Sequence, residues 1–193
     1  YLRVVTQKNA LLKAWNRTPG AGEMRQIFDE QLIRLGEEIE KRRADYLAAL
    51  AGPACRCYAE ISGGSEALTL AYQPSTQPGE SLAAALDRLR VAELRAGCCL
   101  AGPHRDDFSV LLDGQPARVF GSQGQQRSVV LSLKLAEAEQ ARQVTGRHPV
   151  MLLDDVLSEL DAGRQSYLLT RMEGKQTFVT ACESAAFLRT DGV

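Results

Sequence analysis

The chain has 193 residues, of which 45% are hydrophobic and 24% are charged. This balance excludes a disordered chain and is enough for one globular domain or two small ones. The formal net charge of -1 excludes a global basic field, so any contact with nucleic acid must come from a local patch. No apolar run approaches the roughly 20 residues of a membrane helix, so we expect no membrane association.

The cysteines form no CxxC pair, and no histidine stands at metal-ligand spacing from them. They are Cys55, Cys57, Cys98, Cys99 and Cys182. An odd number of cysteines without a secretory signal indicates reduced thiols and a cytoplasmic location. We interpret Cys98-Cys99 as part of a small buried strand rather than as a redox pair. The chain begins at Tyr1 without an initiator methionine and already in a helical pattern, which indicates a piece of a longer protein.

Residues 1–15 are compatible with a short helix, and turn residues follow at 16–20. A long helix is predicted over 23–50, where apolar residues recur at alternating spacings of four and three, interrupted by Arg42. These residues are Phe28, Leu32, Leu35, Ile39 and Tyr46. We favour an amphipathic helix packed in a bundle over a coiled coil, because the heptads are few. Gly52-Pro53 is predicted to end this helix.

Residues 61–64 predict a turn, 67–72 a strand and 74–79 a loop. Ser81 is placed to cap a helix that runs to Ala96, with Gly97 at its end. Arg88 and Arg95 lie seven residues apart on one face of that helix. Two interpretations stay open for them: a solvated face, which we favour, and a basic stripe that contacts DNA phosphates.

The second half of the sequence favours strands and then a strand–helix alternation. A strand over 108–112 ends in the hairpin signal Asp113-Gly114, and a second strand is predicted over 117–120. A helix of ~20 residues follows over 125–144, then a buried strand over 150–153, a helix over 161–172 and a strand over 177–180. We therefore predict an α/β fold with a parallel sheet in residues 97–193, and a mainly helical, arm-like subdomain in residues 1–96.

Two carboxylates stand at the carboxyl end of the strand over 150–153, where α/β sheets place their ligands. Asp154 is suited to hold Mg²⁺, because that ion prefers few carboxylates together with phosphate oxygens. Asp155 is then suited to orient or deprotonate an attacking water. Taken alone, the pattern more often belongs to a strand that simply ends in a polar turn.

A second polar motif lies immediately before the long helix over 125–144. Ser122 and the backbone N–H groups of Gly124 and Gln125 stand at the positive end of that helix, where phosphate binds. The alternative is that Ser122 simply caps the helix. Taken alone, the motif favours the cap.

Three motifs in order resemble the ABC ATPase superfamily. Ser122-Gln123-Gly124-Gln125 is similar to its signature motif, residues 150–155 to its Walker B strand, and Ser158 to Asp161 to its D-loop. We call these the signature-like motif, the Walker B-like strand and the D-loop-like segment. The residues of these motifs resemble even more closely those of the RecF family of bacterial recombinational repair proteins. Three segments carry this resemblance: Gly102-Pro103-His104-Arg105-Asp106-Asp107, Ser122-Gln123-Gly124-Gln125-Gln126-Arg127, and residues 152–161.

The resemblance implies a head-to-tail homodimer with ATP between the protomers, closed by the signature helix of one on the nucleotide of the other. It further implies binding of single-stranded or gapped DNA, work with RecO and RecR, and a role in replication, recombination and the SOS response to DNA damage. The phosphate loop G-x-x-x-x-G-K-[ST] is absent from the sequence. We therefore expect the C-terminal half of such a protein, in which ATP and Mg²⁺ binding and slow hydrolysis require the missing loop.

Some positions depart from the superfamily. Asp155 stands where many ABC enzymes have Glu, and no histidine follows residues 177–180. The family-motif residues His104, Arg105 and Asp106 have no derivable role, and we favour anchoring of a turn over contact with nucleotide or DNA for His104 and Arg105. Two alternatives to a RecF-type ATPase stay open: an ABC transporter subunit, which predicts a switch histidine, and a non-catalytic interaction module.

Overall fold

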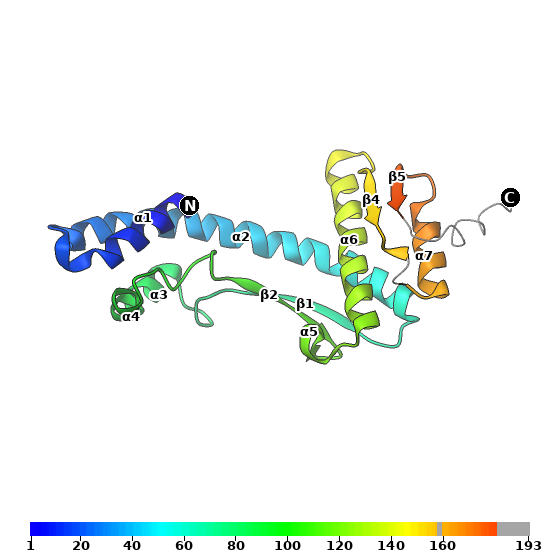
Figure 1. Cartoon of the computed structure of the whole chain (residues 1–193), viewed down its shortest axis with the longest axis horizontal. Coiled ribbons are helices and arrows are strands. Elements are labelled where there is room, and N and C mark those ends of the chain that lie inside the picture. The colour runs from blue at the N-terminus through cyan, green and yellow to red at the C-terminus, as the bar shows by residue number, and fades with distance from the viewer. Residues whose placement is uncertain (158–159, 181–193) are drawn as a thin grey trace. The chain divides into compact units, whose positions relative to one another are not determined.

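The computed structural model describes residues 1–157 and 160–180 (Figure 1). The chain forms two compact units: a first unit of Tyr1–Ala48 with Ala71–Ser109, and a second unit of Ala49–Leu70 with Val110 onward. The sequence instead predicts one division, between residues 96 and 97, and that division stays a prediction. Helices occur together with a parallel pair of strands, so the mixed α/β class is confirmed.

The first unit is mainly helical. Its elements are α1 (Leu2–Lys13), the 3-10 turn η1 (Trp15–Arg17), the first part of α2 (Ala21–Ser62), α3 (Leu82–Arg88) and α4 (Arg90–Ala96). Leu32 of α2 and Leu82 and Leu86 of α3 are buried together in one apolar cluster. Ser81 caps α3 by accepting a hydrogen bond from the Ala84 N–H, and Gly97 ends α4 in the left-handed conformation. Both helix boundaries are therefore confirmed.

The predicted single helix from Ser81 to Ala96 is wrong, because it breaks at Leu89. The second piece buries Glu93, whose carboxylate lies 2.7 Å from the ammonium of Lys8. Lys8 also pairs with Asp29 at 2.8 Å. Burial opposes the charge of Lys8, but the two carboxylates outweigh that effect and raise its pKa. This ion pair joins residues far apart in the sequence, so no local pattern could indicate it.

Helix α2 runs unbroken through Pro53, so the predicted stop at Gly52-Pro53 is wrong. A proline inside a helix costs about 3 kcal/mol. The turns beyond it bury Ala54, Cys57 and Tyr58. Tyr58 is the large side chain among them, and burial of an aromatic side chain removes roughly 150–250 Å² from water at about 25 cal/mol per Å², which offsets the cost. Packing overrides the local signal here.

A three-stranded sheet has the order β1-β2-β3. Its strands are β1 (Leu68–Gln73), β2 (Asp107–Leu112) and β3 (Gln115–Pro116). The hairpin at Asp113-Gly114 is confirmed, since β2 pairs antiparallel with β3 and both turn residues have positive φ.

Two strand predictions in this region are wrong. Residues Ala117–Phe120 form a short helix, α5, because β3 ends at Pro116, which has no N–H to continue a ladder. The Cys98-Cys99 segment forms no strand. Its Cys99 N–H donates instead to the side chain of Asn9, at 2.7 Å.

The second unit contains the strand–helix alternation that the sequence predicts. Its elements are α6 (Gln123–Thr145), β4 (Met151–Asp154), α7 (Ala162–Met172) and β5 (Thr177–Thr180). Strands β4 and β5 pair in parallel, with Leu152 opposite Phe178, which confirms the predicted parallel sheet. Leu153 is buried with side chains of α6 and α7, whereas Leu152 is 74% exposed. The expectation of a fully buried strand is therefore wrong for this chain.

Within the part of the chain that the structure describes, none of the helices combines the length and the apolar composition of a membrane span.

Candidate functional site

The amino end of α6 carries the signature-like motif as a closed capping box. The Ser122 side chain accepts a hydrogen bond from the Gln125 N–H at 3.2 Å, and the Gln125 side-chain oxygen accepts one from the Ser122 N–H at 2.6 Å. The Ser122 side chain is exposed. The N–H groups of Gln123 and Gly124 lie in the first turn, before any intrahelical acceptor. The motif thus combines an ordered hydroxyl with the positive end of a 23-residue helix.

Glu66, which belongs to the second unit, holds this capping box in place. The Gln125 side-chain NH₂ donates to one oxygen of the Glu66 carboxylate. The other oxygen accepts from the hydroxyl of Tyr58, at 2.6 Å. Tyr58 belongs to α2 and is 1% exposed. Sequence reasoning missed Glu66, because it lies in a turn and contacts the motif only through the fold.

Arg164 contacts the motif on another side. A Cβ atom at residue 124 would lie 3.1 Å from a guanidinium nitrogen of Arg164. The same side chain forms an ion pair with Asp161 at 2.9 Å. Asp161 caps α7 by accepting from the Arg164 N–H, also at 2.9 Å. The D-loop-like residue Asp161 is therefore joined to the signature-like motif by one side chain, whereas Ser158 lies outside the described residues.

The two carboxylates of the Walker B-like strand end β4. Asp154 accepts a hydrogen bond from the Thr180 hydroxyl at 2.6 Å, which ties the end of β4 to the end of β5. The Asp155 N–H lies 2.9 Å from the same hydroxyl oxygen. Asp155 has a φ of 52°, in the left-handed region. Asp tolerates that conformation better than most residues, which gives a physical reason for Asp rather than Glu here.

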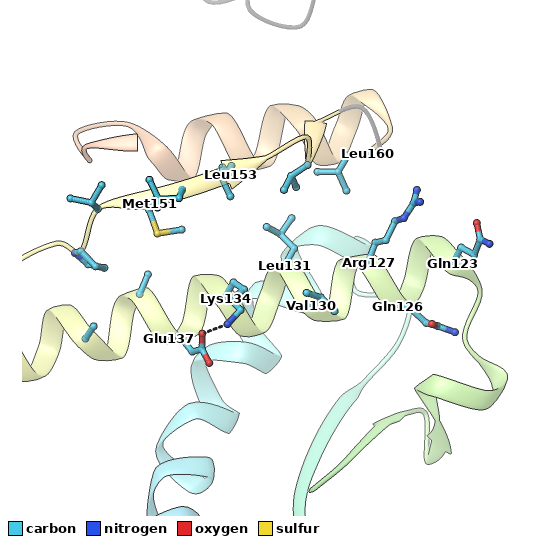
Figure 2. A pocket seen from close by; sticks show the side chains of 16 residues that line it. Gln123, Gln126, Arg127, Val130, Leu131, Lys134, Glu137, Met151, Leu153 and Leu160 are labelled. Carbon is cyan, nitrogen blue, oxygen red and sulfur yellow. Dashed lines mark hydrogen bonds and ion pairs between the residues drawn. The ribbon is translucent and has the colours of Figure 1, made fainter. Parts of the chain in front are cut away.

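Figure 2 shows α6 and β4 running in opposite directions, so that β4 ends at the side where α6 begins. A groove of about 870 Å³ separates them. Its walls include Leu131, Met151 and Leu153, and Gln123 and Arg127 stand at the end nearest the start of α6. Most of the groove is apolar and suits packing against hydrophobic side chains. Ser122, Asp154 and Asp155 are not among the residues that line it.

The donor set at the end of β4 fits a magnesium ion held largely by a nucleotide. Among the described residues, no three His, Cys, Asp or Glu side chains gather closely enough to hold a metal ion by themselves. Mg²⁺ commonly uses one or two carboxylates, with waters and phosphates filling its other positions. Asp154 is exposed at the end of a strand and offers such a carboxylate.

The family-motif residues lie in the first unit and anchor a turn. His104 Nδ1 lies 2.9 Å from the Tyr1 hydroxyl, and its Nε2 lies 3.3 Å from the Cys99 carbonyl. Burial lowers the pKa of His104 and favours the neutral ring. The Arg105 guanidinium donates to the same carbonyl at 3.2 Å. These contacts fit the turn-anchoring interpretation of both residues.

Asp106 ties a second segment to that turn. Its carboxylate accepts from the Ser75 N–H at 2.7 Å and from the Tyr72 hydroxyl. Nearby, one oxygen of Glu40 is buried without a hydrogen-bond partner. Burial, together with the charges of Asp106 and Glu37, raises the pKa of Glu40 to about 7.

The predicted basic stripe is only partly available. Arg88 ends α3 and forms two hydrogen bonds with the Glu80 carboxylate, at 2.6 and 2.7 Å. Arg95 lies on the next helix, α4, and is exposed. The pair therefore does not lie on one continuous helix, and Arg88 already has a carboxylate partner. Their contact with DNA stays a prediction.

Comparison with known proteins finds relatives that carry the same name. No protein-family profile matches the chain. DNA replication and repair protein RecF of Synechocystis sp. is 43% identical over 204 residues, which cover 97% of this chain and 53% of that protein. RecF of Moorella thermoacetica is 44% identical, over 95% of this chain and 50% of that protein. The chain thus spans about half the length of the curated relatives that it matches.

Solved structures agree with these relatives. A structure described as the recombination mediator protein RecF-ATP in the RecFOR pathway matches 95% of this chain with a TM-score of 0.84 and 36% identity. The same protein described as RecF-ATPrS matches with a TM-score of 0.83 and 35% identity. The chain covers 52% of each of those chains.

Proposed function

The chain is a RecF-family sequence that matches the C-terminal half of its relatives, and on this premise we propose that it supplies two half-sites of an ATP-dependent switch in DNA replication and repair. One half-site is the signature-like motif at the start of α6. The other is the pair of carboxylates at the end of β4. A phosphate loop encoded elsewhere in the full-length protein completes the second half-site, and a partner protomer completes the first.

One observation carries this proposal. The signature-like motif forms an ordered, exposed capping box at the amino end of α6, in a chain whose sequence holds no phosphate loop. A helix amino end of this kind binds an anion. The γ-phosphate of ATP held by a second protomer is the anion that the family resemblance supplies. The relatives' names favour a DNA repair protein over a transporter subunit. The RecF-ATP structure favours a nucleotide-binding protein over a simple interaction module.

In the closed dimer, the Ser122 hydroxyl and the first N–H groups of α6 bind the γ-phosphate of the partner's nucleotide. The capping box holds Ser122 in place before ATP arrives, so little ordering is needed on closure. Gln125 contributes by orientation, because its N–H already donates to Ser122 and its side chain is bound by Glu66.

At the other half-site, Asp154 holds the magnesium ion beside the phosphates of the protomer's own nucleotide. That ion, when bound, neutralises charge on the β- and γ-phosphate oxygens. Asp155 orients the attacking water from the end of β4. Its fixed left-handed backbone and short side chain restrict its reach, which fits the slow hydrolysis of a switch.

The remaining parts of the proposal follow from the relatives. We expect an ATP-dependent homodimer that binds single-stranded or gapped DNA and works with RecO and RecR in the cytoplasm. The RecFOR pathway named for the solved relatives supports the two protein partners. Mg²⁺ is expected from the chemistry of Asp154 alone.

The test uses the full-length protein and the change Ser122→Arg. The added side chain occupies the space of the incoming phosphate, so ATP-dependent dimerisation should be lost while each monomer still binds nucleotide. Sedimentation velocity with and without ATP measures the first, and a fluorescent ATP analogue measures the second. Ser166→Arg, on an exposed position of α7, is the matched control. Unchanged dimerisation of Ser122→Arg would contradict the proposal.

A further inference from the structure

Arg164 makes two contacts at the first turn of α7. Its backbone N–H donates to one oxygen of the Asp161 carboxylate at 2.9 Å, and its guanidinium pairs with the other oxygen at 2.9 Å. The Arg164 side chain is 26% exposed. The backbone and the side chain of Arg164 therefore both hold the Asp161 carboxylate, and the ion pair fixes the direction of the guanidinium.

That direction brings the guanidinium against Gly124. The missing Cβ at this position would lie 3.1 Å from Nη1 and 3.9 Å from the guanidinium carbon. Gly124 lies inside α6 and has no positive φ, so its backbone does not require glycine. Glycine also weakens a helix relative to alanine. A Cβ at this position would crowd the Arg164 guanidinium and would need it to shift by a few tenths of an ångström.

The charges explain why Asp161 is needed as well. A guanidinium beside the amino end of α6 meets the positive end of the helix dipole, which is unfavourable for an unpaired cation. The Asp161 carboxylate offsets this repulsion. Once paired, the guanidinium stays beside the signature-like motif.

We propose that Arg164 is a positioning residue that couples Asp161, the last residue of the D-loop-like segment, to the signature-like motif within one chain. This inference rests on the proposed function. In a head-to-tail dimer the Walker B-like strand serves the protomer's own nucleotide, and the signature-like motif serves the partner's nucleotide. Arg164 thereby couples one ATP site to the other, because it holds Asp161 at the start of α7 beside Gly124 at the start of α6.

The experiment compares three changes in the full-length protein: Arg164→Ala, Arg164→Lys and the matched control Arg171→Ala. Arg171 lies on the same helix and also pairs with a carboxylate, Glu60, but not with the motif. We expect Arg164→Ala to weaken ATP-dependent dimerisation about tenfold, a typical coupling between sites, and to lower kcat. Binding of ATP to the monomer should stay within about twofold of the parent, because uncoupling does not alter that site.

Arg164→Lys should recover only part of the loss, since lysine can pair with Asp161 but lacks the planar fork that lies against Gly124. Arg171→Ala should dimerise and hydrolyse like the parent. Melting temperatures identify a variant that fails to fold, in which case Arg164→Lys decides.

Two failures are distinguishable. In the first, Arg164→Ala dimerises and hydrolyses ATP like Arg171→Ala, while Ser122→Arg does not dimerise; Arg164→Lys takes the place of Arg164→Ala if the alanine variant does not fold. The positioning role is then wrong and the proposed function stands. If Ser122→Arg also dimerises normally, the proposed function itself is wrong. A loss of monomer ATP binding equal to the loss of dimerisation would likewise contradict positioning, because it indicates general damage.

Discussion

Replacing Glu66 with alanine should destabilise the second unit far more than its place in a turn suggests. Its carboxylate accepts from the Tyr58 hydroxyl at 2.6 Å and from the side-chain NH₂ of Gln125. Hydrogen bonds to charged acceptors contribute roughly 1.5–3 kcal/mol each. The Tyr58 hydroxyl, on a residue that is 1% exposed, would lose its partner. Because Glu66 is only partly buried, water replaces part of the loss, and we expect about 2–4 kcal/mol in total.

Urea unfolding of the chain, followed by circular dichroism, measures this change. Glu139→Ala is the matched control, because it removes the same charge from an exposed ion pair with Arg142. It should cost no more than about 0.5 kcal/mol. A double-mutant cycle of Glu66→Ala with Tyr58→Phe should show a coupling of roughly 1–2 kcal/mol. If Glu66→Ala cost no more than Glu139→Ala, or if the cycle were additive, the link between α2 and the signature-like motif would be refuted.

Three further predictions concern charge and pH. Asp155→Asn in the full-length protein should slow hydrolysis but spare ATP binding, and normal turnover would remove Asp155 from the water-handling role; asparagine tolerates the left-handed backbone, so the change tests charge alone. Glu40, with its pKa raised to about 7, is protonated more in the folded than in the unfolded protein between pH 4.5 and 7. Its ionisation therefore lowers stability as pH rises, and Glu40→Gln should stabilise the chain at pH 8 by roughly 1 kcal/mol after allowance for partial exposure and much less at pH 5; an equal gain at both pH values would contradict this. Arg95→Glu should weaken DNA binding and flatten its salt dependence more than Arg88→Glu does. If neither change had an effect, both arginines would belong to a solvated face.

The sequence correctly predicted the helix ends, turns and strands that depend on interactions between neighbouring residues. Helix α6 and its ends follow from Ser122 at the cap and Gly146 after the last turn. The hairpin follows from Asp113-Gly114, and the parallel strands follow from short apolar runs separated by a helix. These features need only a few neighbouring residues, so the sequence pattern was sufficient.

Several of the errors, and the omissions at the candidate site, come from contacts between residues far apart in the chain. The passage of α2 through Pro53 depends on burial of the turns beyond it. The break at Leu89 accompanies the burial of Glu93 against Lys8. At the candidate site, the sequence indicated the residues of the motif itself.

The residues that hold the motif were not predicted. Glu66 and Arg164 reach Gln125 and Gly124 only through the fold, and neither belongs to a periodic pattern or a recognised motif. Gly124 was the one available signal, because glycine lets another group approach the backbone closely. It indicated close approach by some group, but not which group.

The central claim is that the signature-like motif acts on the partner's nucleotide, and mixing two inactive variants tests it most directly. Full-length Ser122→Ala and Asp155→Asn should each hydrolyse ATP slowly alone. In a mixed dimer, one site combines the intact Asp155 of one protomer with the intact Ser122 of the other. Equal mixing should restore up to about a quarter of the parent rate, because half of the dimers are mixed and each has one intact site of two. A mixture no faster than the mean of the two variants would contradict action across the dimer.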